Sequence, residues 1–177
     1  MPIKKTSEVK ISRVWAMPDP KTFSIKPIAT LITSYVNGKD IIIDPFANGS
    51  KIGTITNDLN PEFSTDFHMD ALAFLKLQKT AIADVVLYDP PYNSAQASTC
   101  YKKFGKEKLE INVSNALYWS KVRNEISRVL KKDGICISFG WNTVGIGKKN
   151  NMRIVEILDV CHGGCHYDTL VTVEKKC

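Results

Sequence analysis

The sequence predicts an α/β fold built on a mainly parallel sheet. Short apolar runs bounded by Gly, Pro or Asp alternate with segments in which apolar residues recur at helical spacing. This alternation is typical of a parallel sheet covered by helices on both faces, and 177 residues suit a single domain. Near the C-terminus, two strand patterns flank Gly163-Gly164 and predict an antiparallel hairpin.

The N-terminal half begins with a segment of low periodicity. Residues 1–22 contain Pro18 and Pro20, so we expect an irregular arm, followed by one domain over residues 23–177. Pro27 suits the first turn of a helix. The elements expected in this half are a helix over 27–36, strands over 41–43 and 53–56, and a helix over 71–76.

In the C-terminal half, an apolar strand over residues 85–88 stops at Pro90 and Pro91, which cannot donate to a sheet ladder. A helical stripe of apolar residues follows within 117–130. Its members are Trp119, Val122, Ile126 and Val129. The remaining elements expected are strands over 135–139, 154–160 and 169–173.

Three of the expected strands end on an acid. Asp44, Asp58 and Asp89 each follow an apolar run. Because ligands bind at the carboxyl ends of parallel strands, we expect these carboxylates to converge at one edge of the sheet and to mark a site there.

The charge of the chain favours a polyanionic partner. The net charge is +6 and the sequence pI is near 9.0. Lysines are concentrated after the Pro-Pro pair and in two later pairs. These lysines are Lys102, Lys103, Lys106 and Lys108, then Lys131 and Lys132, and Lys148 and Lys149.

We expect a cytoplasmic protein without membrane contact. No apolar run approaches the roughly 20 residues of a membrane helix, and the basic N-terminus lacks the apolar segment of a signal peptide. Five cysteines are an odd number, which favours free thiols. Residues 161–166, CHGGCH, offer zinc ligand types without a second ligand pair elsewhere, so we interpret them as a Gly-Gly turn and expect no metal.

A family resemblance rests on short motifs at the ends of these strands. Asp89-Pro90-Pro91-Tyr92 resembles the catalytic tetrapeptide of amino-group DNA methyltransferases, in its adenine-N6 form. Asp44-Pro45-Phe46-Ala47 is similar to the start of their S-adenosylmethionine motif, and Lys26-Pro27 to the element that opens the cofactor pocket. Asp58 stands where their ribose-binding acid stands, and Asp70 where a residue meets the adenine ring of the cofactor.

The resemblance spans roughly residues 22–175 and is greatest to small adenine-specific methylases of phages and prophages. It implies a Rossmann-like methyltransferase fold, S-adenosylmethionine as cofactor and methyl transfer to the N6 amine of adenine in DNA. In that chemistry the Asp89 carboxylate and the Pro90 carbonyl accept hydrogen bonds from the amine and aim its lone pair at the methyl group. Tyr92 offers a stacking face for a base swung out of the duplex.

The sequence departs from the family pattern after Ala47. The family has a glycine-serine-glycine turn and a helix there, whereas residues 48–53 lead almost directly into the next strand. A parallel crossover usually needs a dozen or more residues, so we expect the first crossover helix to be reduced or missing. The sheet face behind Ile41 to Ile43 and Ile55 would then be bare. Either the arm over residues 1–22 folds back over it or a second copy of the chain covers it, and we favour the homodimer.

No segment is long enough to form a separate target-recognition domain. We expect the short basic stretches 93–115 and 143–151 to contact nucleic-acid phosphates and the recognition sequence to be short. The predicted nucleic-acid contacts are Tyr92, Lys102, Lys103, Lys106, Lys148 and Lys149.

Three alternatives stay open at the level of sequence. The substrate class includes adenine N6 in RNA, which nothing in the sequence excludes, and cytosine N4 in DNA, against which Asp89 in place of Ser argues. A third alternative is a catalytically degenerate binding subunit. The altered turn at Asn48-Gly49-Ser50 supports it, and the intact tetrapeptide argues against it.

Overall fold

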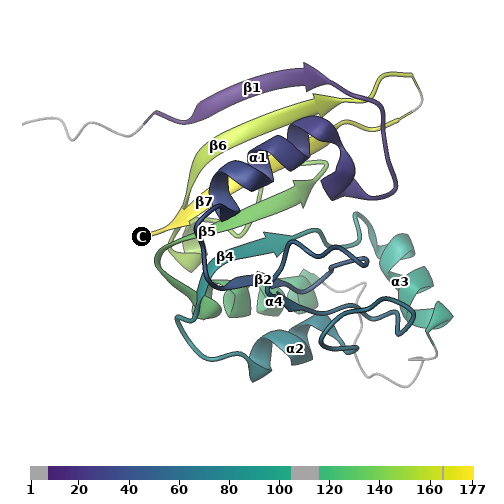
Figure 1. Cartoon of the computed structure of the whole chain (residues 1–177), viewed down its shortest axis with the longest axis vertical. Helices are drawn as coiled ribbons and strands as arrows, with labels where there is room; N and C mark the ends of the chain where they lie inside the picture. Colours follow the sequence, from purple (N-terminus) through teal and green to yellow (C-terminus); the bar gives the residue numbers. More distant parts are fainter. Residues whose placement is uncertain (1–7, 105–115, 165) are drawn as a thin grey trace, which may run out of the picture.

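The computed structural model describes residues 8–104, 116–164 and 166–177, which form a seven-stranded sheet with helices on both faces (Figure 1). The strand order is β1-β6-β7-β5-β4-β2-β3. The strands are β1 (Lys10–Trp15), β2 (Ile42–Asp44), β3 (Ile55–Thr56), β4 (Ala83–Tyr88), β5 (Leu130–Gly140), β6 (Met152–Cys161) and β7 (Thr169–Lys176).

The described helices are α1 (Lys26–Val36), α2 (Ala71–Leu77), α3 (Ser94–Lys103) and α4 (Ala116–Val129), with short 3-10 turns η1 (Thr22–Ser24) and η2 (Lys148–Asn150). Strand β7 runs antiparallel to both β5 and β6, and the other strand pairs are parallel. The predicted α/β fold with a C-terminal hairpin is therefore confirmed. Among the described residues, none of the helices combines the length and the apolar character needed to cross a bilayer.

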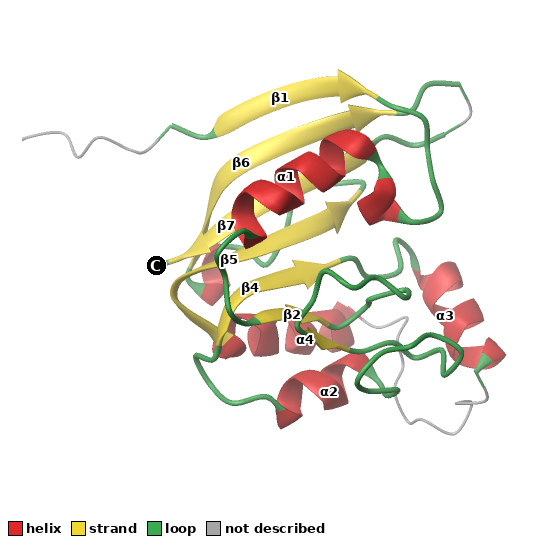
Figure 2. Ribbon diagram, in the orientation of Figure 1, coloured by secondary structure: helices red, strands yellow, loops and turns green. Residues whose placement is uncertain are grey.

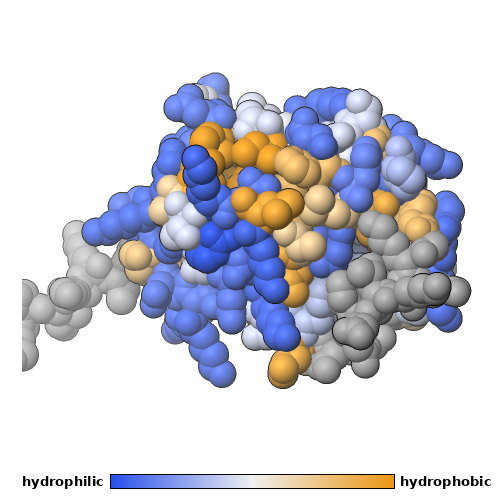
Figure 3. Space-filling view, turned by 90° about the horizontal axis from the view of Figure 1, so that it is seen from below, coloured by the Kyte–Doolittle hydropathy of each residue, from blue (hydrophilic) through white to orange (hydrophobic). Residues whose placement is uncertain are grey.

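Helices lie on both faces of the sheet (Figure 2), and a hydrophobic layer fills each of the two interfaces. On one face, α1 buries Ile28 and Ile32 against side chains of β4, β5, β6 and β7. On the other face, α2 and α4 bury Phe74 and Ile126. Figure 3 shows the face of the molecule seen from below, where hydrophilic residues surround a smaller hydrophobic area. The two layers hold the sheet rigid up to the carboxyl ends of its central strands.

The N-terminal arm is not irregular throughout, and the prediction is wrong for Lys10–Trp15. This segment forms β1, which extends the sheet by pairing in parallel with β6. Two ion pairs support the pairing: Lys10 Nζ lies 2.6 Å from Glu156 Oε1, and Arg13 Nε lies 3.1 Å from Asp159 Oδ2. Because most β1 side chains stay exposed on both faces, the segment lacks the alternating pattern that marks a strand in a sequence.

Between β2 and β3 the described chain forms turns and no helix, so the predicted loss of the first crossover helix is confirmed. The predicted bare sheet face is wrong for Ile42 and Ile43, which are 5% and 0% exposed. Ile42 packs in the α1 layer, with Ile52 of the turn beside it, and Ile43 packs in the layer of α2 and α4. Strand β1 does not supply the cover, because it lies at the opposite edge of the sheet from β3.

Candidate functional site

The tip of β4 carries the predicted tetrapeptide. The strand ends at Tyr88, and Asp89 follows as a partly buried side chain. Burial raises the pKa of Asp89 to about 6, although the nearby hydroxyls of Thr22 and Tyr92 act to lower it. At pH 7 the group is therefore largely a carboxylate, held in a setting that favours taking up a proton.

Tyr92 is tied to the start of the following helix. Its backbone N–H donates to Gln96 Oε1 over 2.8 Å, in the first turn of α3. Burial, together with the nearby charge of Asp89, raises the pKa of Tyr92 to about 12. The phenol therefore stays neutral, and with Asp89 and Thr169 it lines the central cavity.

The three predicted acids do converge at the carboxyl ends of β2, β3 and β4. Asp44 is fully buried, and burial raises its pKa well above the ordinary value, with further raising by the nearby charges of Asp89 and Asp58. Its Oδ1 accepts a hydrogen bond from the Phe46 backbone N–H at 3.1 Å, whereas Oδ2 has no partner in the described part of the chain. A buried carboxylate oxygen without a partner marks a place where a donor from outside the chain fits.

Asp58 closes the turn that replaces the missing helix. Its Oδ2 accepts from the Asn48 backbone N–H and its Oδ1 from the Asn60 backbone N–H, both at 2.8 Å. The side chain still lines the central cavity and keeps lone pairs for further donors. Nearby, Gly53 has no room for a side chain, since a Cβ there would stand 2.9 Å from Asp44 Cβ.

A central cavity of about 610 Å³ is lined by Asp58 and Asp89, whereas the fully buried Asp44 is not among its lining residues. A neighbouring cavity of about 460 Å³ shares Thr22, Phe46 and Asp89 with it and reaches Ala47. Lining residues of the central cavity that enter the argument below are Pro45, Phe46, Asp58, Phe63, Asp89, Tyr92, His162 and Thr169. A third cavity, of about 400 Å³, lies beyond Pro90 and Pro91, against Trp119 and Arg123 of α4.

Phe46 both packs against neighbouring aromatic rings and lines the candidate site. Its ring packs 5.9 Å from the ring of Tyr88 and 6.3 Å from that of Trp119, measured between centroids. It also lines the two cavities beside Asp89. Pro45 and Ala47 on either side of it are buried, and the Ala47 N–H donates to the Asn57 carbonyl at 2.9 Å.

Asp70 is engaged within the chain instead of facing a cavity. Its Oδ1 caps α2 by accepting from the Ala73 N–H at 2.9 Å. Its Oδ2 accepts from the hydroxyls of Tyr101 and Tyr118 at 2.5 and 2.6 Å. The side chain is 4% exposed, so the predicted cofactor contact would require these hydrogen bonds to be exchanged.

The predicted basic contacts do not form one surface. Lys103 at the end of α3 lines the central cavity, Lys102 beside it is exposed, and Lys106 lies outside the described residues. Lys148 and Lys149 precede β6, which runs parallel to β5. They therefore lie at the amino ends of these strands, whereas the tetrapeptide lies at the carboxyl end of β4. Sequence spacing could not show this, because it does not tell at which end of the strands a connecting segment lies.

Lys26 and Pro27 open α1, as predicted, with the proline in the first turn. Lys26 is exposed and Pro27 is partly buried. Neither lines one of the three cavities above, whereas their neighbour Ile25 lines the central one. The structure therefore places this pair beside the candidate cofactor site and not within its walls.

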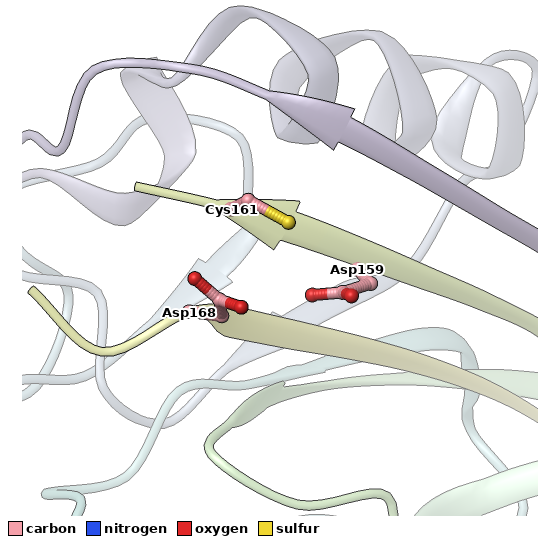
Figure 4. A group of neighbouring side chains, drawn as sticks. All are labelled: Asp159, Cys161 and Asp168. Atoms are coloured by element: carbon pink, nitrogen blue, oxygen red, sulfur yellow. The ribbon is translucent and has the colours of Figure 1, made fainter. Parts of the chain in front are cut away.

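The CHGGCH segment forms the predicted turn, in which Gly163 and Gly164 have φ angles of 66° and 57°. Cys161 groups with Asp159 and Asp168, and one ligand-type atom from each lies within 4.8 Å of the others (Figure 4). Arg13 Nε donates to Cys161 Sγ at 2.8 Å and pairs with Asp159. A guanidinium therefore already neutralises this cluster.

Comparisons with known proteins agree on the fold. No protein-family model and no curated protein sequence matches this chain. Solved structures do match. The 1,6-didemethyltoxoflavin-N1-methyltransferase of Burkholderia thailandensis, with bound S-adenosylhomocysteine, is 11% identical to this chain, with a TM-score of 0.59. The match covers 85% of this chain and 77% of that protein. The N-methyltransferase NodS of Bradyrhizobium japonicum is 9% identical with a TM-score of 0.55, covering 90% and 99%.

TrmN of Thermus thermophilus gives a third match, with 13% identity, a TM-score of 0.56 and coverage of 86% of this chain and 49% of its own. At these identities the likeness is one of fold. The chain has a Rossmann-like methyltransferase fold, as the sequence predicted. Strand β1 lies beyond β6 at one edge of the sheet.

Proposed function

We propose that this protein transfers a methyl group from S-adenosylmethionine to the N6 amine of adenine in DNA. The observation that carries the proposal is the Asp89-Pro90 tip of β4, which lines a cavity whose far wall holds Asp58. S-adenosylmethionine supplies an electrophilic methyl group on a positively charged sulfur. The methyltransferase fold and the S-adenosylhomocysteine bound in one similar structure support this cofactor.

The residues present fit a cationic nucleoside cofactor. The unpartnered Oδ2 of buried Asp44 and the lone pairs of Asp58 can accept from ammonium or ribose hydroxyl donors. Phe46 and Phe63 offer apolar faces in the same walls. We assign cofactor binding to the segment Asp44-Pro45-Phe46-Ala47 together with Asp58. Asp70 supports it indirectly, by holding the start of α2.

The target amine would be bound by two acceptors at the tip of β4. The Asp89 carboxylate and the Pro90 carbonyl each take one hydrogen bond from the amine, which frees its lone pair from the ring and points it along one line. Pro90 and Pro91 lack N–H groups, so no donor competes with the amine at this tip. The Tyr92 ring lies on the wall between two cavities, where a swung-out base can stack on it.

Transfer of tritium from labelled S-adenosylmethionine to DNA, to RNA or to neither tests the proposal. We expect label in DNA as N6-methyladenine. Label in RNA, or as N4-methylcytosine, would redirect the substrate assignment, and binding of cofactor without transfer would favour a binding subunit. Asp89→Ala is the matched control: it should abolish transfer and keep the cofactor affinity, and activity within tenfold of the parent would contradict the role of Asp89.

A further inference from the structure

The loop after β5 presents two exposed apolar side chains beside the tetrapeptide. Residues 141–147, here called the rim loop, follow the end of β5, which runs parallel to β4. Trp141 and Val144 are 63% and 65% exposed, and both line the cavity of about 400 Å³ that Pro90 and Pro91 also line. The exposed indole of Trp141 therefore lies at the same end of the sheet as the proposed catalytic tip.

The rim loop is anchored by a buried acid. Glu174 of β7 is 1% exposed, and its two carboxylate oxygens accept from the backbone N–H groups of Ile146 and Gly147 at 2.5 and 2.9 Å. Ile146 is itself buried, and its carbonyl accepts from Asn150 Nδ2 at 2.8 Å. Gly145 has a φ of 53°, and a Cβ there would overlap the Glu174 carboxylate. The loop is thus fixed by β5 at one end and by Glu174 at the other.

The cavity beside the rim loop differs in charge from the central cavity. The central cavity is lined by Asp58 and Asp89 and suits a cationic cofactor. Among the described residues, the lining of the smaller cavity includes Arg123 and no carboxylate. The aromatic residues that line it are Tyr92, Trp119 and Trp141. A cation with aromatic rings and no acid suits a negatively charged ligand that carries flat rings, as nucleic acids do.

Methylation of a base in a duplex creates a use for an exposed ring at this place. A base that swings out of the helix leaves a gap in the stack, and the loss of stacking and pairing opposes the movement. Apolar side chains that enter between base steps can offset this loss. The Tyr92 ring is proposed above to stack on the base that leaves, so a second ring is needed for the gap.

We propose that Trp141 enters the DNA duplex at the position that the target base leaves and stacks on the neighbouring bases, with Val144 beside it. The inference rests on the function proposed above. The rim loop is then an apolar nucleic-acid contact at the carboxyl ends of the strands. It supplies stacking, whereas the lysines of α3 supply charge.

A duplex with one central abasic site tests this contact without knowledge of the recognition sequence, because its gap is already open. We expect the parent to bind it about tenfold more tightly than the intact duplex of the same sequence, since the indole stacks without the cost of swinging out a base. Trp141→Ala should lose this preference and Trp141→Phe should keep most of it. Because no charge is removed, the slope of log affinity against log salt should stay parental in both variants.

Leu77→Ala is the matched control, because Leu77 is also 63% exposed but ends α2, ahead of β4 and away from the rim loop. It should keep the parental preference. Glu174→Gln should lower the preference, since its amide would place a donor against a backbone N–H, and an unchanged preference in this variant would overturn the anchoring role of Glu174.

Fluorescence anisotropy with the two labelled duplexes measures these affinities. A parent without preference for the abasic duplex, or Trp141→Ala with the parental preference, would overturn the proposal, and so would tighter binding of single-stranded RNA than of either duplex. The readout is separate from methyl transfer. A preference that depends on Trp141 in a protein that transfers no label to DNA would support the contact and reject the methyl-transfer function alone.

Discussion

At the scale of single residues, Asp89 combines a proposed catalytic role with a cost in stability. The fold raises its pKa because the carboxylate is partly removed from water, yet the proposed reaction needs that carboxylate ionised. Asp44 experiences the same conflict more strongly, since it is fully buried. The carboxyl ends of the central strands are therefore the part of this molecule where function opposes stability.

We expect Asp89→Asn to abolish methyl transfer and to stabilise the fold near neutral pH. The pKa of Asp89 rises from 3.8 to about 6, so its stabilising contribution is complete below pH 3.8 and is lost as the pH rises through 6. The parent thus loses up to about 3 kcal/mol that the variant keeps. Calorimetry at pH 4 and pH 7.5 measures the difference in Tm, and a difference that does not grow with pH would show the assignment of this pKa to be wrong.

Substitutions of Tyr92 separate its ring from its hydroxyl. Tyr92→Ala should weaken binding of the swung-out base by about 1–3 kcal/mol, because the stacking face is lost. Tyr92→Phe should recover most of that affinity, because the stacking face is kept. DNA titrations measure the affinities of the parent and of both variants. Equal affinities of the Phe and Ala variants would contradict stacking.

At the scale of elements, turns connect β2 to β3 where the fold usually has a crossover helix. Asp58 ties Asn48 and Asn60 to one carboxylate, and Gly53 lets β3 approach β2 without a side chain between them. The short connection can close because these contacts replace the packing that a crossover helix would provide. Its residues also line the cavities to which we assign the cofactor.

We expect Gly53→Ala to destabilise the fold by about 1–3 kcal/mol, because its Cβ would stand 2.9 Å from Asp44 Cβ and force a shift. The shift should also weaken cofactor binding. Denaturant unfolding and calorimetric titration with S-adenosylmethionine measure both effects. Gly140→Ala serves as a control, since its Cβ would meet nothing within 4 Å and its φ, like that of Gly53, is not in the left-handed region. Equal losses of stability in both variants would contradict the role of the close approach.

Helix α3 should provide part of the electrostatic contact with nucleic acid. Lys102 and Lys103 end this helix beside the central cavity, so replacing both with Gln should reduce the slope of log affinity against log salt by about two. The pair Lys148 and Lys149 carries the same charge at the opposite edge of the sheet and gives a matched control. An equal change in both double variants would show that DNA does not bind at the α3 edge.

At the scale of the whole molecule, the homodimer remains a prediction, and its interface would form on a different surface from the sheet face that the sequence suggested. The sheet face that suggested it is covered, whereas β1 and the residues after it expose several large apolar side chains. Exposed fractions are 71% for Ile11, 65% for Trp15 and 68% for Met17. An unpaired outer strand with apolar side chains is a surface on which a second chain can pair.

We expect the parent to dimerise at micromolar concentration and Ile11→Lys to shift it to a monomer, since a charge would be added to the pairing strand. Sedimentation equilibrium measures both. Val144→Lys offers a control, because Val144 is also 65% exposed and lies on the loop after β5. A parent that sediments as a monomer at tens of micromolar would end the dimer prediction.

The sequence by itself determined the parts of this protein that depend on neighbouring residues. The apolar runs, the prolines that stop β4 and the acids at strand ends are all local features of the sequence. They were sufficient to predict the parallel sheet, the missing helix and the convergence of Asp44, Asp58 and Asp89. Only the tertiary structure decided what depends on residues far apart in the chain. Examples are the pairing of β1 with β6, the hydrogen bonds of Tyr101 and Tyr118 to Asp70, and the contact of the His162 ring with the Ala16 carbonyl. No local period or spacing in the sequence records those contacts.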